Sequence, residues 1–170
     1  LDPRRLYFPN TASQLGRHVA VSPQNSDLKH LHYGRIRLRS ATAPSVTFET
    51  GARETGLLCM KGSCLLNVAA EAGAAEAAAT AARQSIELGQ YDAVYIPRGY
   101  TVEVSTGAEV DLVECAAEVT GDYPLQIVRY AEVEKVPSLK FSAGAEASRR
   151  DLNILIGNNV KAGRIVAGFT

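Results

Sequence analysis

The sequence predicts an all-β fold, either a sandwich or a barrel. Short runs rich in β-branched and aromatic residues are separated by Gly, Pro, Asn and Asp, and few helical repeats lie among them. The candidate strands are 17–21, 29–39, 45–50, 56–68, 84–88, 92–97, 100–105, 109–116, 125–133, 151–156 and 163–170. Roughly ten strands spaced at about a dozen residues favour one compact β domain.

Alternation along the second run assigns its two faces. In 29–39, every second residue from His30 to Leu38 shares one face, while Arg35, Arg37 and Arg39 share the other. We expect the arginine face to contact water. In 100–105, Tyr100, Val102 and Val104 face one way and polar residues the other, so Val102 is expected in the core.

The segment Gln90–Ser105 predicts a strand, a sharp corner at Pro97 and Gly99, and a second strand. It resembles the second motif of the cupin superfamily, in which a metal-binding His follows three residues after the Gly. Here that position is Val102, which has no lone pair to give a metal. The resemblance implies a cupin-like double-stranded β-helix, or jelly-roll barrel, without a metal at this position.

The region that corresponds to the first cupin motif lacks histidine as well. Within 46–62, no His occurs near Phe48 and Thr50, and Glu49 and Glu54 are the candidate ligands. Two lone carboxylates do not make a transition-metal site. We therefore expect no metal site in this barrel.

A His-x-His pair, His30 and His32, provides the remaining metal candidates, because this spacing lets two imidazoles converge on one ion. The pair lies too early in the chain to match the cupin motif, and no acidic residue in the strand completes the set. The alternative is that these imidazoles bond to backbone groups.

Other catalytic motifs are missing from the sequence. It has no Gly-x-Ser-x-Gly elbow and no phosphate-loop spacing. Cys59, Cys64 and Cys115 lie in apolar runs without Cys-x-x-Cys spacing, which favours reduced core thiols over a disulfide or a zinc knuckle. Arg149 and Arg150 could clamp a carboxylate or form a solvated pair.

Composition and termini give further expectations. The net charge is zero, so no global field would attract nucleic acid or an anionic membrane, and no run approaches the roughly 18 apolar residues that span a bilayer. No signal peptide opens the chain, and a cytoplasmic protein is expected. The Ala-rich tract Ala69–Arg83 predicts a surface insertion, helical or mobile. A start at Leu1 without Met and an apolar end at Thr170 suggest a fragment.

The C-terminal third resembles the middle of the bicupin sugar isomerases. These are the 5-deoxyglucuronate isomerase of inositol catabolism and the 5-keto-4-deoxyuronate isomerase of pectin breakdown. The similarity is carried by Glu134–Pro137, Ala147–Arg150 and Gly163–Thr170, with support upstream from Leu88–Tyr95 and Gly62–Cys64.

This resemblance implies that residues 1–150 form a degenerate N-terminal cupin barrel and that 151–170 are the first strands leading to a second barrel. In the family a divalent metal, usually zinc, is held by the second barrel. No catalytic, cofactor-binding or metal residue is therefore expected in this chain, which alone would be inactive. The full-length protein would act on a small sugar acid.

Two alternatives stay open. One is a non-catalytic barrel for dimerisation or ligand binding, and the other is a different bicupin enzyme, such as an aminohydrolase or a dioxygenase. A homo-oligomer is expected in each case, with dimers that pair their terminal strands.

Overall fold

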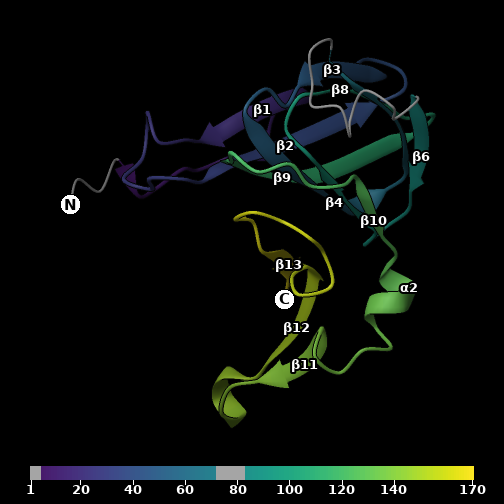
Figure 1. The fold of residues 1–170 in the computed structure, drawn as a ribbon. Helices are drawn as coiled ribbons and strands as arrows, with labels where there is room; N and C mark the ends of the chain where they lie inside the picture. Colours follow the sequence, from purple (N-terminus) through teal and green to yellow (C-terminus); the bar gives the residue numbers. More distant parts are fainter. Residues whose placement is uncertain (1–4, 72–82) are drawn as a thin grey trace.

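The computed structural model describes residues 5–71 and 83–170, which are mostly antiparallel β-sheet (Figure 1). The strands of the barrel are β1 (Gly16–Val21), β2 (His32–Arg39), β3 (Ser45–Glu49), β4 (Arg53–Gly62), β5 (Cys64–Ala70), β6 (Gln84–Leu88), β7 (Ala93–Ile96), β8 (Tyr100–Ser105), β9 (Glu109–Glu118) and β10 (Gln126–Val128). The C-terminal part contains α2 (Tyr130–Val133), β11 (Lys140–Ala143), the short 3-10 helix η2 (Glu146–Ser148), β12 (Arg150–Ile156) and β13 (Ala167–Phe169).

The barrel consists of two sheets that face each other. Sheet A has the order β1-β2-β9-β4-β7-β10, and sheet B has the order β3-β8-β5-β6. Strands that follow one another in sequence repeatedly change sheets, as β3, β4 and β5 do. This crossing pattern is that of a jelly roll, so the all-β jelly-roll barrel predicted from the sequence is confirmed.

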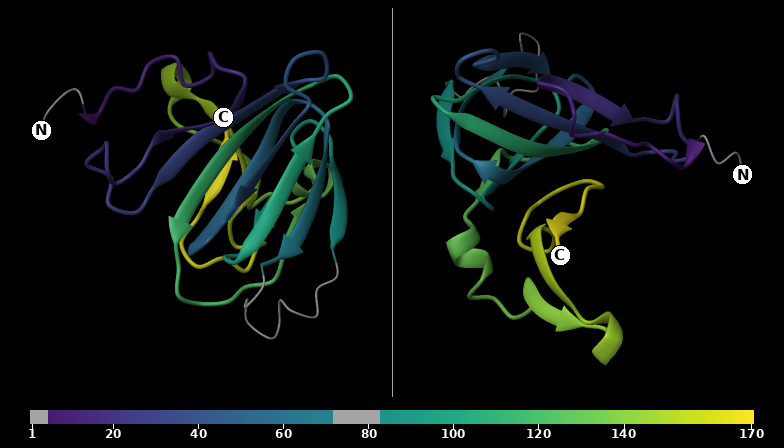
Figure 2. Two further views of the ribbon diagram at one scale, coloured as in Figure 1. Left: turned by 90° about the horizontal axis from the view of Figure 1, so that it is seen from above. Right: turned by 180° about the vertical axis from the view of Figure 1, so that it is seen from behind.

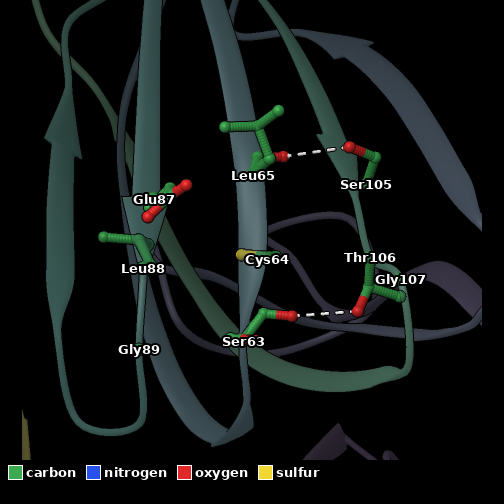
Figure 3. A pocket seen from close by; sticks show the side chains of 9 residues that line it. All are labelled: Ser63, Cys64, Leu65, Glu87, Leu88, Gly89, Ser105, Thr106 and Gly107. Carbon is green, nitrogen blue, oxygen red and sulfur yellow. Dashed lines mark hydrogen bonds between the residues drawn. The ribbon is translucent and has the colours of Figure 1, made fainter.

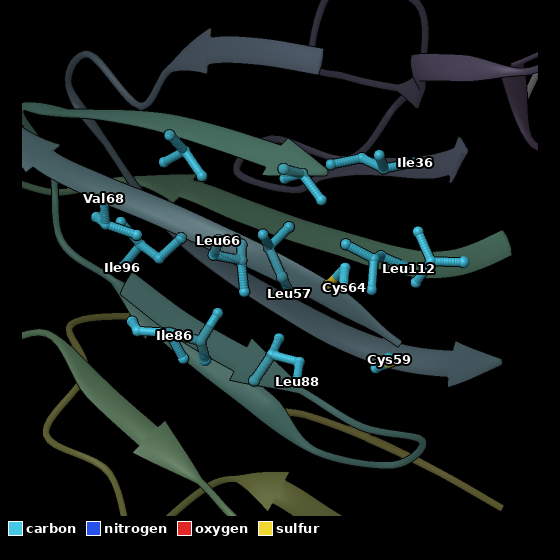
Figure 4. Packing of buried hydrophobic residues seen from close by; sticks show 14 of the residues in the cluster. Ile36, Leu57, Cys59, Cys64, Leu66, Val68, Ile86, Leu88, Ile96 and Leu112 are labelled. Atoms are coloured by element: carbon cyan, nitrogen blue, oxygen red, sulfur yellow. The ribbon is translucent and has the colours of Figure 1, made fainter. Parts of the chain in front are cut away.

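The core lies between the inner faces of the two sheets, where aliphatic side chains from both meet (Figure 4). Ile36, Leu57, Leu66, Val102 and Leu112 come from five different strands and are all 0% exposed. Each occupies the inward position of an alternating strand. The predicted inward orientation of Val102 is therefore confirmed.

The corner between β7 and β8 is built as the Pro-x-Gly pattern predicts. Gly99 has a φ of +73°, which a residue without Cβ adopts without strain. The Thr50 hydroxyl donates to the carbonyl oxygen of Pro97 at 3.0 Å and accepts from the backbone N–H of Tyr100 at 2.9 Å. The end of β3 is thereby fixed to the corner.

A C-terminal layer packs on part of the outer face of sheet A. β11, β12 and β13 form a third sheet, sheet C, in which β13 and the end of β12 lie beside sheet A while β11 extends away from the barrel (Figures 1 and 2). Leu58 and Tyr95 of sheet A pack with Leu155, Ile156 and Ile165 in this second hydrophobic cluster. The domain boundary expected between residues 150 and 151 falls at the start of β12, which pairs with β11. This boundary stays a prediction.

Several predicted strand limits were wrong. Residues 56–68 form two strands, because β4 belongs to sheet A and β5 to sheet B. The run 125–133 ends as a strand at Val128 and continues as α2, whose first N–H donates to Asp92 at 3.0 Å. In 163–170 only 167–169 is strand, and β11 was not predicted.

The run predicted as 29–39 starts at His32, because 29–31 form a bend before β2. Ala69 and Ala70 close β5 rather than belonging to an insertion, and the rest of the predicted insertion, 72–82, lies outside the described residues. Within residues 5–71 and 83–170, no helix is long and apolar enough to cross a bilayer.

The arginine face of β2 is half-buried rather than fully wet. Arg35 donates from Nε and Nη2 to the two carboxylate oxygens of Asp111 in β9, at 2.9 and 2.6 Å, and Arg37 lies 3.6 Å from the same carboxylate. Arg39 is exposed, as predicted.

The three cysteines are free thiols, as the sequence predicts. Burial raises the pKa of Cys59 to about 11, that of Cys64 to about 12 and that of Cys115 to about 11. A raised pKa decreases the fraction of reactive thiolate at neutral pH.

We expect the folded protein to resist a thiol reagent at pH 8, where the three raised pKa values leave few thiolates. Labelling by Ellman's reagent should proceed to three thiols only after addition of denaturant. Rapid labelling of any cysteine in the native protein would contradict the burial described here.

Candidate functional site

The positions at which cupin motifs place metal ligands are closed by packing in this barrel. Phe48 of β3 pairs with Val102 of β8, and both side chains belong to the hydrophobic core. The Thr50 hydroxyl is already bonded at the corner. These positions therefore present hydrocarbon and one occupied hydroxyl to the interior.

The two carboxylates proposed as alternative ligands do not meet. Glu49 is exposed at the end of β3 in sheet B, whereas Glu54 is fully buried on the outer face of sheet A. Neither side chain points into the barrel, because each is out of phase with the inward residues of its strand.

The histidine pair is also separated by the start of β2. His30 is exposed in the preceding bend, and His32 is half-buried as the first residue of the strand. Burial, and then the charge of Arg53, lowers the pKa of His32 below its ordinary value. In the described part of the chain, no group of three or more His, Cys, Asp or Glu residues could hold a metal ion.

An ion pair closes the inner rim of the barrel beside His32. Arg17 of β1 donates to both oxygens of Glu114 at 2.7 Å, and its guanidinium lies 4.2 Å from the centre of the Phe48 ring. Glu114 is only 3% exposed. A bidentate pair of this kind satisfies both charges, so Arg17 is not available to bind an acidic ligand unless Glu114 moves.

Among the described residues, the Glu54 side chain accepts the largest number of hydrogen bonds. Its Oε2 accepts from the Tyr95 hydroxyl at 2.8 Å and from the Gly163 N–H at 2.7 Å. Its Oε1 accepts from the N–H groups of Arg164 and Ile165 at 2.6 and 2.8 Å. We call this arrangement the Glu54 clamp.

The clamp joins two parts of the chain more than a hundred residues apart. It draws 163–165 onto sheet A, where a Cβ at Gly163 would lie 2.8 Å from Val119 and 3.2 Å from Glu54. Burial, and then the hydrogen bond to Glu54, raises the pKa of Tyr95. The tyrosine therefore stays protonated and continues to donate.

A second aromatic contact holds the same layer. Tyr91 stacks on Phe169 of β13 with ring centres 4.9 Å apart and meets Tyr130 edge-on at 5.3 Å. Its φ of +71° is unusual for a bulky residue.

A shallow pocket of about 380 Å³ opens at one end of sheet B (Figure 3). Cys64, Leu65 and Leu88 supply its apolar lining, and Glu87 is its charged residue. Hydrogen bonds between its own groups, such as that from Thr106 to the Ser63 carbonyl at 2.9 Å, use polar atoms at the wall. The hydroxyls of Ser105 and Thr106 at its wall donate to the backbone carbonyls of Leu65 and Ser63.

Arg149 and Arg150 are both exposed at the start of β12. Arg149 lies 3.2 Å from the Ser142 hydroxyl across the turn between β11 and β12. The two guanidinium groups thus lie at the surface, away from the barrel interior.

Sequence reasoning missed the ion pair and the clamp. Glu114 could have been found, because it lies on the apolar face of the alternating run 109–116 together with Val110 and Leu112. Glu54 gave no such signal, since its partners are backbone groups of a segment distant in sequence.

The fold and the closed interior define a class of protein: a cupin-like jelly-roll barrel with hydrocarbon side chains at the motif positions. The model of the KduI/IolB family matches residues 6–170, and the chain therefore belongs to the KduI/IolB family. No curated protein matches the chain.

Two solved structures are similar to this chain. An IolB-like protein from Salmonella typhimurium LT2 is 18% identical with a TM-score of 0.69, and the match covers 89% of this chain and 54% of that one. The chain thus spans about half the length of that protein. The Cnp3 cupin domain from Schizosaccharomyces pombe is 12% identical with a TM-score of 0.42, covering 54% of this chain and 58% of that one.

Replacing Glu54 by Gln should destabilise the protein by about 3 kcal/mol, because the amide cannot accept all four hydrogen bonds and the charge is lost. Urea denaturation measures this change. The exposed Glu49→Gln variant is the matched control and should stay within about 0.5 kcal/mol of the parent. Equal free energies of unfolding for the two variants would show that the Glu54 clamp does not stabilise the fold.

Replacing Val102 by His should not create a zinc site, because neighbouring Phe48 and Thr50 add no free ligand. The buried imidazole should also lower stability by about 1–3 kcal/mol. Metal analysis after dialysis against zinc, with the parent chain as control, tests this. Stoichiometric zinc in the variant would show that other ligands reach the interior.

Proposed function

We propose that the full-length protein is an aldose–ketose isomerase acting on a deoxyuronate, 5-deoxyglucuronate of inositol catabolism, and that this barrel is its non-catalytic half. Membership of the KduI/IolB family over residues 6–170 is the observation that carries the proposal. The family includes 5-keto-4-deoxyuronate isomerase, which acts on the same chemical class of substrate.

The proposed reaction needs no oxidant or reductant. A base removes the proton from the hydroxyl-bearing carbon beside the carbonyl while the carbonyl oxygen gains a proton, which gives an enediol. A proton is then delivered to the former carbonyl carbon as the neighbouring hydroxyl loses its proton and becomes the new carbonyl. A divalent metal such as zinc, held by the second barrel in this proposal, would polarise the carbonyl and stabilise the developing charge. Residues 5–71 and 83–170 supply no step of this chemistry.

The contribution proposed for this chain is mechanical. The Glu54 clamp and the Tyr91–Phe169 stack hold the layer from 163 to 169 firmly on sheet A. A catalytic site built on strands following this layer would inherit its position, and small misplacements of reacting groups cost large factors in rate. A cytoplasmic location is part of the same proposal.

A second candidate is a non-catalytic module that serves dimerisation or ligand binding. The packing of the interior favours it, because Phe48 and Val102 place hydrocarbon at the positions where cupin motifs carry metal ligands. Under this candidate the full-length protein would bind partners or ligands and would turn over neither uronate.

An assay of the full-length protein on 5-deoxyglucuronate and 5-keto-4-deoxyuronate decides between the two. We expect isomerisation of at least one sugar acid, loss of activity with a chelator and recovery with zinc. The control is Val102→Leu, which changes only the inner wall of this barrel. The full-length variant should keep the metal content of the parent protein, because the proposed metal is held by the second barrel. Absence of turnover on both substrates, or turnover indifferent to chelation, would count against the isomerase.

A further inference from the structure

A tip projects from the barrel at its N-terminal side (Figure 1). It comprises residues 5–7 and the loop 22–31, and we call it the N-terminal tip. Arg5 donates to Asp27 at 2.6 Å and also to the Ser26 carbonyl, which fastens the first segment to the loop. The Ser26 hydroxyl donates to the Ser22 carbonyl at 2.7 Å, and the Ser26 side chain is buried.

Side-chain hydrogen bonds order the rest of the loop. Asn25 accepts from the Ser22 N–H at 2.8 Å and donates to the Ala20 carbonyl at 2.9 Å. The loop thus has a defined shape before it meets any partner, which decreases the entropy lost on binding.

The tip exposes large apolar side chains. Leu6 is 53%, Tyr7 74%, Leu28 45% and Leu31 37% exposed. A group of such residues on an ordered, projecting element is typical of a binding surface rather than of a solvated loop. The neighbouring Lys29 and His30 are exposed as well.

The outer face of sheet B has the complementary character. The C-terminal layer packs on part of the outer face of sheet A, whereas the outward residues of β3, β5, β6 and β8 are exposed or half-buried. They include Glu49, Glu87 and Glu103 and no Lys or Arg, although Arg83 beside β6 pairs with Glu103. Leu65, 38% exposed, lies in the shallow pocket beside Glu87.

The charged side chains of the tip and the pocket are complementary at one position. Within the tip, Arg5 pairs with Asp27, and Lys29 is exposed. A second copy of the chain offers Glu87, exposed beside Leu65, to this lysine and to the apolar side chains of the tip.

The tip cannot reach this pocket in its own molecule. In all three ribbon views, the tip and β6 lie on opposite sides of the barrel (Figures 1 and 2). We propose that the N-terminal tip of one copy docks in the sheet B pocket of a second copy. Tyr7 and Leu28 would contact Leu65, and Lys29 would face Glu87.

This contact joins two different surfaces, so it is heterologous. Repetition of such a contact gives a closed ring when the rotation permits and a filament when it does not. It also differs from the pairing of terminal strands expected from the sequence, because it leaves β13 unused.

A charge swap tests the proposal on the full-length protein. We expect Lys29→Glu and Glu87→Lys each to weaken self-association by about tenfold or more, as the charge pair becomes repulsive. A mixture of the two variants should associate again, because each acidic tip meets a basic pocket. Light scattering with size-exclusion chromatography, at low and high salt, measures this.

Glu49→Lys is the matched control, since it reverses a charge at the other end of the same sheet face and should leave association unchanged. Circular dichroism shows that each variant is folded. A parent protein that stays monomeric at all concentrations, an unaffected Glu87→Lys variant, or a mixture that stays dissociated would each overturn the proposal. An equal loss of self-association in Glu49→Lys would also overturn the proposal, because the effect would then come from the overall charge of the protein and not from the pocket.

Discussion

The attachment of the C-terminal layer to the barrel is centred on one buried carboxylate. Glu54 takes four hydrogen bonds, three of them from consecutive backbone N–H groups at 163–165. A charge removed from water is tolerated only when its lone pairs are satisfied, and these donors satisfy them. Because the donors belong to the C-terminal layer and the acceptor to the barrel, neither part is complete without the other.

The second constraint is the filling of the barrel. Val102 and Phe48 meet across β8 and β3, so the volume in which a metal-binding cupin keeps imidazoles is taken by hydrocarbon. Close packing of that kind fills the space between Phe48 and Val102 with hydrocarbon. A barrel of this type is suited to hold another element in place. The sheet A face performs this role, and the sheet B face remains open to solvent.

Much of this fold could be predicted from local sequence. Period-two alternation placed Val102 in the core, and the Pro97 and Gly99 pair gave the corner, because both signals arise within a few residues. The division of 56–68 into two strands was missed, since the choice of sheet depends on distant partners. Glu54 appeared as a possible ligand and proved to be a structural acceptor, because its role is set by backbone groups that no side-chain pattern reveals.

The central claim is that this half of the molecule is a metal-free scaffold. It is tested most directly by a crystal structure of the full-length protein grown with zinc, with anomalous difference density collected at the zinc edge. We predict no anomalous peak inside the barrel lined by Phe48 and Val102, with the bonds from 163–165 to Glu54 in place. A zinc ion coordinated by side chains of this barrel would contradict it.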